Sequence, residues 1–377
     1  MPEKKTETYT KARPSEPLRV LLVANSDIVG KRVHEALDKQ PDITITSQAT
    51  DGVSAVSAMR RVIFDVIVVD IGQTGSNAMV TVSRILKVDP AAKIVMVGSL
   101  SFNNVKISMR VLMEGAAAFI PTPAAHTKTT SELAFSRDLL ENIRAFERSE
   151  RELDHRLKPS RVDISKPRLS SQPQKPIELR PAAKMVPDVL AVGSSTGGPQ
   201  ALFTFIATLP QDFDLPIMIT QHMPATFTTL LASHITKNSS RECHEGVNGE
   251  PIKRGRLYLA PGDQHMIAVS KNGIPHIQLN DDEPVNFCRP SVDPMLDSLT
   301  EVYNGKVLTV ILTGMGADGC KSAIRLVEKG GIVVAQDQET CVVWGMPRAV
   351  AEAGICSAIL PIDELAPFVG KLAKPGW

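Results

Sequence analysis

Three polar residues that could together perform nucleophilic catalysis each follow a separate apolar segment of the chain. Ser195 lies in residues 193–197, Gly-Ser-Ser-Thr-Gly, which fit the G-x-S-x-G pattern of a sharp turn that exposes a serine hydroxyl. His222 and Asp318 follow two other apolar segments. A serine hydroxyl is a good nucleophile at neutral pH only when a histidine accepts its proton and a carboxylate orients that histidine. The three residues therefore predict a Ser–His–Asp triad.

Each of these residues also has a simpler interpretation. Ser195 could cap the following helix, His222 could be an ordinary buried histidine, and Asp318 could form a turn or cap a helix. The turn 193–198 could instead hold a phosphate or a dinucleotide, because it precedes a helix N-terminus. A dinucleotide site needs an acidic residue at the end of the next strand, and that segment ends in Gln221 and His222. The triad is the favoured hypothesis, and the phosphate site is the alternative.

Thiol and metal chemistry have less support in the sequence. The five cysteines are scattered, odd in number and form no CxxC pair, a pattern typical of reduced thiols. Cys288 and Cys320 lie near glycine-rich segments, but the sequence shows for neither the histidine-paired context that a reactive thiolate needs. The eight histidines contain no H-x-x-x-H pair, so no metal site is predicted. We expect no metal or organic cofactor.

Length and composition indicate a soluble protein of more than one domain. The 377 residues are too many for one ordinary core, and the chain is 43% hydrophobic and 22% charged, as in globular proteins. A net charge of +1 and only 4% aromatic residues argue against nucleic-acid binding. No secretory signal and no apolar run long enough to span a bilayer are evident. We therefore expect a cytoplasmic protein without membrane insertion.

The second half of the chain, residues 185–377, should position the triad on a doubly wound α/β domain. Apolar segments at 186–192, 216–220 and 306–313 read as strands that end just before Ser195, His222 and Asp318. The carboxyl ends of parallel strands meet at one edge of a sheet, so the three side chains should converge there. Further strands are expected at 256–260, 265–270 and 332–336, and helices at 200–209, 291–303 and 347–353.

The first half of the chain, residues 18–125, alternates five predicted strands with helices, which indicates a second doubly wound parallel sheet. It resembles the receiver domain of response regulators, on Phe-Asp-Val-Ile-Val-Val-Asp at 64–70 and Gly-Ala-Ala-Ala-Phe at 115–119. The strands are expected at 18–24, 43–47, 66–70, 93–98 and 119–121, and the helices at 26–40, 53–62, 79–88 and 105–114.

The phosphorylation chemistry of that family is mostly missing. Asp70 matches the phosphoacceptor, but the acidic pair that holds Mg²⁺ in receivers falls on Ala24 and Asn25. The family's hydroxyl and lysine fall on Gly98 and Thr122. We therefore expect a pseudo-receiver in which Asp70 is a structural cap rather than a working phosphoacceptor.

Residues 126–184 connect the two halves. The segment 131–157 carries charges of both signs around apolar residues at helical spacing, so it should be a helix that packs one narrow stripe on the receiver. An interdomain lever or a dimerisation helix is the functional alternative. Residues 158–184, rich in proline, serine, lysine and arginine, should be a linker, and residues 1–17 a terminal tail.

Several further motifs give residues 186–372 a specific family resemblance. They resemble the catalytic domain of bacterial chemotaxis protein-glutamate methylesterases (CheB), and the order receiver, linker, esterase matches that family too. The motifs are Val-Gly-Ser-Ser-Thr-Gly-Gly-Pro at 192–199, Gln-His-Met-Pro at 221–224, Leu-Ala-Pro-Gly-Asp-Gln-His-Met at 259–266, Cys-Arg-Pro-Ser-Val-Asp at 288–293, Leu-Thr-Gly-Met-Gly-Ala-Asp-Gly at 312–319 and Val-Trp-Gly-Met-Pro at 343–347.

The resemblance implies a serine hydrolase of chemosensory adaptation. It would remove methyl groups from glutamate methyl esters of chemoreceptors and deamidate certain receptor glutamines. Ser195 would attack the ester, His222 would act as base and then acid, and Asp318 would orient His222. Backbone N–H groups near Thr196 and Met315 would stabilise the oxyanion.

The same resemblance implies how the activity is controlled. In the family the receiver covers the catalytic cleft until it is phosphorylated. Here we expect its release by a binding partner, or a constitutive output. Expected partners are methyl-accepting chemoreceptors and a chemosensory histidine kinase or adaptor protein. The competing hypothesis is a catalytically silent adaptor that uses the same fold to bind receptors.

Overall fold

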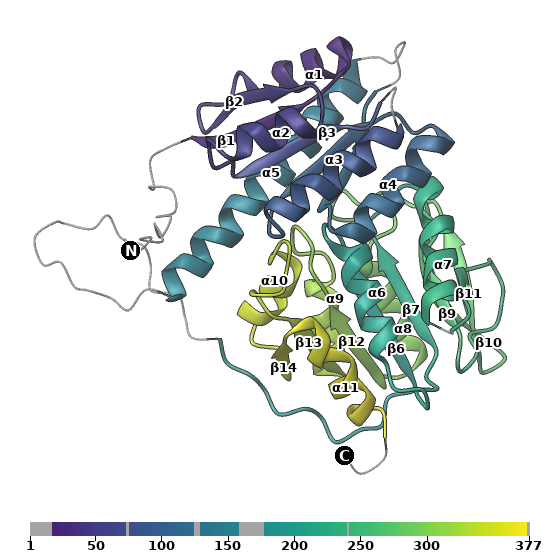
Figure 1. The fold of residues 1–377 in the computed structure, drawn as a ribbon. Helices are drawn as coiled ribbons and strands as arrows, with labels where there is room; N and C mark the ends of the chain where they lie inside the picture. The colour runs from purple at the N-terminus through teal and green to yellow at the C-terminus, as the bar shows by residue number, and fades with distance from the viewer. Residues whose placement is uncertain (1–16, 73–74, 124–128, 158–176, 240, 375–377) are drawn as a thin grey trace, which may run out of the picture.

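Two parallel sheets, one from each half of the chain, organise the structure (Figure 1). The computed structural model describes residues 17–374 except 73–74, 124–128, 158–176 and 240. Most of the predicted terminal tail and residues 158–176 of the predicted linker therefore lie outside the described residues. Within them, no helix combines the length and the apolar character needed to cross a bilayer.

The first sheet has five parallel strands in the order β2-β1-β3-β4-β5, which confirms the doubly wound fold expected for this half. Helix α1 begins where predicted, because the Ser26 hydroxyl accepts a hydrogen bond from the amide of Val29. The strands are β1 (Leu18–Val23), β2 (Ile43–Ala49), β3 (Val66–Asp70), β4 (Ile94–Gly98) and β5 (Ala118–Pro121); the helices are α1 (Asp27–Leu37), α2 (Gly52–Met59), α3 (Gly75–Val88) and α4 (Phe102–Glu114).

The second sheet has seven parallel strands in the order β14-β13-β12-β6-β7-β9-β8. The chain runs outward in opposite directions from the β12–β6 pair, so the switch point where α/β proteins place their sites lies there. The strands are β6 (Val189–Ser194), β7 (Ile217–Gln221), β8 (Cys243–Glu245), β9 (Leu257–Leu259), β12 (Val307–Ile311), β13 (Ile332–Gln336) and β14 (Ala358–Leu360); the helices are α6 (Gly198–Thr208), α7 (Ala225–Ser239), α8 (Val292–Val302), α9 (Cys320–Glu328), α10 (Met346–Glu352) and α11 (Ile362–Leu372).

Several elements of this half were not identified from the sequence. They include the three helices α7, α9 and α11 and the edge strands β8 and β14, which have three residues each and are too short to show a period. The predicted strand at 265–270 belongs to a separate antiparallel hairpin of β10 (His265–Lys271) and β11 (Ile274–Asn280). Its Asn272-Gly273 turn, with both φ angles positive, is a hairpin signal that the sequence contains.

The helix α5 (Thr129–Leu157) joins the two halves, close to the predicted range. Leu139, Ile143 and Phe146 bury an apolar stripe of α5 against the first sheet. In Figure 1 the first sheet and α5 lie across one end of the second sheet. Aromatic rings of Phe119 in β5 and Phe227 in α7 meet with centroids 4.9 Å apart. The first half of the chain thus packs directly on the edge where the predicted triad lies.

Candidate active site

The three predicted site loops lie side by side at the carboxyl ends of β6, β7 and β12. The last residue of β6, Ser194, pairs in register with Gln221 of β7. The amide of Ser195 donates to the carbonyl oxygen of Thr313 at 3.0 Å, and the amide of His222 donates to that of Ser194 at 3.1 Å. The parallel sheet therefore brings together segments that are far apart in the sequence.

Three buried side chains that sequence analysis did not select connect these loops. The Ser194 hydroxyl donates to Gln221 Oε1 at 2.6 Å, and Gln221 Nε2 donates to the carbonyl oxygen of Ser195 at 2.9 Å. Thr313 Oγ1 donates to the carbonyl oxygen of Thr196 at 3.0 Å. Their only sequence signal is a polar residue at the end of an apolar strand.

The glycines of the turn 193–198 are required by its shape. Gly197 has a φ of +76° and is the N-cap of α6, where it makes no side-chain cap bond. A Cβ on Gly198 would lie 2.0 Å from Gln221 Oε1. Pro199 occupies the first turn of α6, as predicted. Since the N-cap is Gly197, Ser195 does not cap this helix, and its hydroxyl has no structural role there.

His222 and Asp318 form a buried hydrogen-bonded pair. His222 Nε2 lies 2.7 Å from Asp318 Oδ2, and the two side chains are 11% and 2% exposed. Burial alone would raise the pKa of Asp318, but the bond to His222 and further donors outweigh it and lower that pKa. Those donors to the Asp318 carboxylate are Ser291 Oγ at 2.7 Å, the amides of Val292, Asp293 and Gly319 at 2.6, 3.3 and 3.0 Å, and Asn286 Nδ2 at 2.7 Å.

This pairing decides which nitrogen of His222 can act as a base. An ionised Asp318 only accepts hydrogen bonds, so Nε2 carries a proton in either state of the ring, and in the neutral ring the lone pair is on Nδ1. Burial alone would lower the pKa of His222, but the bonds to Asp318 and Cys288 outweigh it and raise that pKa. The nitrogen of His222 that could act as a base is therefore Nδ1.

The expectation that Cys288 lacks a histidine partner is wrong. Cys288 Sγ lies 3.4 Å from His222 Nδ1, because the loop that precedes α8 folds back over the end of β7. Local sequence could not show this contact between residues that are far apart in the chain. Cys320, by contrast, donates from Sγ to the carbonyl oxygen of Ala349 at 3.4 Å.

Ser195 shares a cavity of about 780 Å³ with His222, Cys288 and the predicted oxyanion residues Thr196 and Met315. Among the described residues no hydrogen bond joins the Ser195 hydroxyl to His222, so the structure forms the His–Asp half of the triad and leaves the Ser–His half open. The amides of Thr196 and Met315 donate to no other described residue, which leaves them available to an oxyanion in this cavity.

The first half of the chain supplies the other wall of this cavity. Thr196 Oγ1 donates to Asn142 Oδ1 of α5 at 3.1 Å, and the amide of Gly197 donates to the carbonyl oxygen of Ala117 at 2.9 Å. The guanidinium of Arg137 lies 5.9 Å from the centre of the Phe287 ring. The turn 193–198, called the nucleophile turn below because it carries the candidate nucleophile Ser195, is therefore bonded directly to α5 and to the residue before β5.

The surroundings of Asp70, at the end of β3, contain few of the groups that a phosphorylated receiver domain needs. Asp70 Oδ1 accepts a hydrogen bond from the amide of Gly72 at 2.7 Å, and burial raises the pKa of the Asp70 carboxyl. The amide of Thr122 donates to the carbonyl oxygen of Gly98. Within the ranges that the structure describes, no cluster of three or more histidine, cysteine or acidic residues could hold a metal ion. The structural role predicted for Asp70 fits this geometry, and its phosphorylation stays untested.

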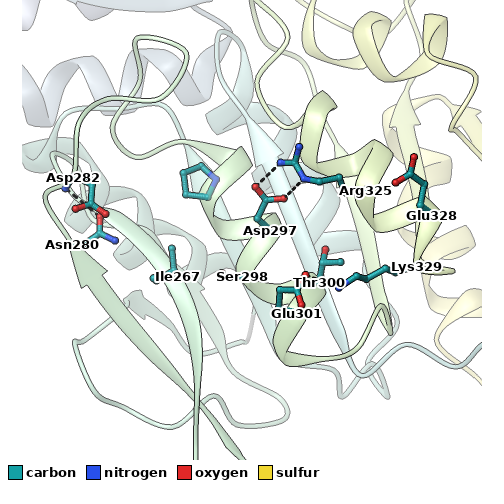
Figure 2. Close-up of a pocket in the computed structure, with 11 residues that line it drawn as sticks. Ile267, Asn280, Asp282, Asp297, Ser298, Thr300, Glu301, Arg325, Glu328 and Lys329 are labelled. Atoms are coloured by element: carbon teal, nitrogen blue, oxygen red, sulfur yellow. Dashed lines mark hydrogen bonds and ion pairs between the residues drawn. The ribbon is translucent and has the colours of Figure 1, made fainter.

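A second cavity, of about 630 Å³, lies between α8, α9 and the β10–β11 hairpin. Figure 2 shows Asp297 of α8 and Arg325 of α9 pointing toward one another across it. Arg325 is bonded to both carboxylate oxygens of Asp297, at 2.8 and 2.5 Å, and Lys329 is paired with Glu301. This cavity contains none of the predicted site residues, and its cations are already paired.

Comparisons with known proteins show which family the chain belongs to. The CheB methylesterase family model matches residues 190–369. A Rhodospirillum centenum protein named protein-glutamate methylesterase/protein-glutamine glutaminase of group 2 operon is 42% identical over 375 residues, 95% of each chain. A protein-glutamate methylesterase/protein-glutamine glutaminase of Azospirillum brasilense is 42% identical over 376 residues, 97% of this chain and 95% of that one.

Among solved structures, the chain is similar to the Thermotoga maritima CheB methylesterase catalytic domain. That domain is 41% identical, with a TM-score of 0.48, over 50% of this chain and 100% of its own. The response regulator domain of Thermotoga maritima CheB is 31% identical, with a TM-score of 0.30, over 34% of this chain and 95% of its own.

Proposed function

This chain belongs to the CheB methylesterase family, and we propose that it is a protein-glutamate methylesterase and protein-glutamine glutaminase that acts on methyl-accepting chemoreceptors. The observation that carries the proposal is the His222–Asp318 pair beside Ser195 on a glycine turn, in one cavity with free amides. A phosphate or dinucleotide site has no use for a buried imidazole–carboxylate pair. A serine hydrolase of the Ser–His–Asp type uses one to activate its serine.

The proposed reaction begins when Ser195 Oγ attacks the carbonyl carbon of a glutamate methyl ester. His222 Nδ1 accepts the hydroxyl proton and then donates it to the departing methanol, while Asp318 stabilises the imidazolium. Water then attacks the acyl-enzyme with His222 again as base, and releases the glutamate carboxylate. With a glutamine substrate, ammonia leaves in place of methanol.

The developing negative charge has two candidate donors. Thr196 and Met315 line the cavity, and one amide donor to an oxyanion typically stabilises the transition state by about 3 kcal/mol. Nδ1 must first exchange its contact with Cys288 for one with Ser195. The described structure is thus a resting state. Before the reaction can start, His222 must change its hydrogen-bond partner.

We further propose that the receiver-like layer regulates access without phosphorylation. Its support is the direct bonding of α5 and Ala117 to the nucleophile turn, together with the neutral residues Ala24 and Asn25 near Asp70. A chemosensory histidine kinase or adaptor in the cytoplasm is the proposed regulatory partner. The proposed domains are a tail at 1–17, the pseudo-receiver at 18–125, a helix and linker at 126–184 and the esterase at 185–377.

The decisive experiment is release of methanol from receptor membranes methylated with a labelled methyl group. Wild-type protein should release label, and Ser195→Ala should lose at least about 10³-fold in rate. Ser194→Ala, which removes the neighbouring hydroxyl, is the matched control and should retain measurable release. Label release that is independent of Ser195, or none from wild type, would favour the silent-adaptor hypothesis instead.

A further inference from the structure

The turn Val285–Cys288 joins the loop before α8 to the candidate triad. The amide of each end residue donates to the carbonyl oxygen of the other, at 3.1 and 2.9 Å, as in a two-residue hairpin. The central residues Asn286 and Phe287 both have positive φ angles, of 53° and 63°. Asparagine tolerates this conformation, whereas it is strained for phenylalanine, and Phe287 is 90% exposed. Both side chains that flank Phe287 reach the triad.

Asn286 lies between two buried carboxylates. Its Nδ2 donates to Asp318 Oδ1 at 2.7 Å and to Asp293 Oδ2 at 2.8 Å. Asp318 and Asp293 are only 2% and 5% exposed, so little water can separate their charges. An amide donor between them offsets their repulsion and fixes the rotation of the Asp318 carboxylate. That rotation determines which oxygen faces His222.

Cys288 acts on the opposite side of the imidazole. Its Sγ lies 3.4 Å from Nδ1, the nitrogen that must accept the proton of Ser195. In the protonated ring Sγ accepts a hydrogen bond from Nδ1–H, so Cys288 occupies the place at Nδ1 that the Ser195 hydroxyl must take. The same turn therefore places one side chain on each partner of the His–Asp pair.

We propose that this turn positions the triad, with Asn286 orienting Asp318 and Cys288 holding Nδ1 of His222 in the resting state. Both are positioning residues, because neither would touch the reacting ester carbon. The inference rests on the proposed esterase function and adds two residues to it. A single rigid turn then fixes the orientation of His222 from both sides.

Removing the Asn286 amide and removing the Cys288 thiol should shift the pKa of His222 in opposite directions. Removing the Asn286 donor leaves the Asp318 carboxylate more negative, which stabilises the imidazolium. Removing the Cys288 thiol takes away an interaction that also favours the imidazolium. Asp318 and Cys288 are the titratable groups in contact with His222; Asp293 faces Asp318, and the other charged residues of the cavity are Asp263, Arg289, Arg137, Asp138, Glu141 and Arg144.

The test measures kcat and KM for methanol release against pH in the full chain. Asn286→Gly is the first variant, since glycine keeps a positive φ without strain and only the amide is lost. Its kcat should fall by about 10- to 100-fold with KM nearly unchanged. The acidic limb of its kcat/KM profile should move to higher pH by about half a unit or more.

Cys288→Ala is the second variant, and its acidic limb should move to lower pH. Cys288→Ser, which keeps an atom that can accept a hydrogen bond from Nδ1–H, should return the limb toward that of wild type. Asn272→Gly is the matched control, because Asn272 has a φ of 52° in the distant β10–β11 turn. It should leave kcat and the profile unchanged.

The inference would be overturned if the acidic limbs of Asn286→Gly and Cys288→Ala shifted in the same direction, or if neither shifted. A uniform loss of rate at every pH would indicate only misfolding, and would also count against it. If wild type itself releases no methanol, the proposed function fails rather than the positioning role. Ser195→Ala in the same assay separates these two outcomes.

Discussion

Asp318 and Asp293 cap each other's helices. Asp318, just ahead of α9, accepts hydrogen bonds from the amides of Val292 and Asp293 at the start of α8. Asp293 in turn accepts one at 3.0 Å from the amide of Ser322 in the first turn of α9. The local N-cap residues of the two helices make no side-chain cap bonds. The candidate catalytic carboxylate is therefore held by the packing of two helices as well as by His222.

Replacing Asp293 by alanine should destabilise the protein and disturb the site together. The change removes a helix cap and leaves donors from Asn286 and Ser322 unpaired, at a cost of about 1–3 kcal/mol in the free energy of unfolding. Urea unfolding measures that cost. Asp297→Ala is the control, because its exposed pair with Arg325 is worth at most about 1 kcal/mol. Equal losses in the two variants would contradict the capping role.

The stability contributed by the His222–Asp318 pair should depend on pH. The raised pKa of His222 means that its contribution is complete below the unfolded value of 6.5 and declines as pH rises through the folded value. The lowered pKa of Asp318 keeps its contribution above 3.8 and loses it as pH falls through the folded value. The pair therefore stabilises most between these two unfolded values.

Denaturant unfolding of wild type and His222→Gln at about pH 6 and about pH 9 checks this. The free energy of unfolding of wild type should exceed that of His222→Gln by less at the higher pH. The decrease should be about 1 kcal/mol or more, the equivalent of about one pKa unit. A difference that stays constant, or grows with pH, would show that the pKa of His222 is not raised in the folded protein.

Asn142→Ala should raise the basal esterase rate of the full chain. The change removes the acceptor that α5 offers to Thr196 and so loosens the wall over the nucleophile turn. A hydrogen bond worth about 1 kcal/mol corresponds to about a fivefold shift toward the open form. Glu141→Ala, on the neighbouring position of α5 and on the same cavity, is the control and should change the rate less. A lower rate in Asn142→Ala would contradict this regulatory contact.

Asp70 should remain unlabelled by acetyl phosphate in the presence of Mg²⁺. One partly buried carboxylate with a raised pKa provides neither the cation site nor the charge that phosphoryl transfer requires. Mass spectrometry of wild type and Asp70→Asn is the measurement. A phosphoryl adduct present in wild type and absent in Asp70→Asn would show a working receiver.

The sequence by itself was sufficient for the two parallel α/β sheets and for the selection of Ser195, His222 and Asp318. Strands and turns are specified by a few neighbouring residues, such as an apolar run, a glycine in a turn or Pro199. These patterns can therefore be recognised in the sequence alone. Short edge strands such as β8 and β14 were missed because their stability comes from neighbours in the sheet rather than from a local period.

Only the tertiary structure decided how the site residues face one another. It placed Nδ1 of His222 against Cys288 rather than Ser195, and it put Asn286 between Asp318 and Asp293. Local residue patterns do not specify these contacts, because each joins loops whose spacing depends on how the sheet and helices pack. A sequence can name the groups that do the chemistry, but their orientation depends on the whole fold, through side-chain contacts that packing alone brings within hydrogen-bond distance.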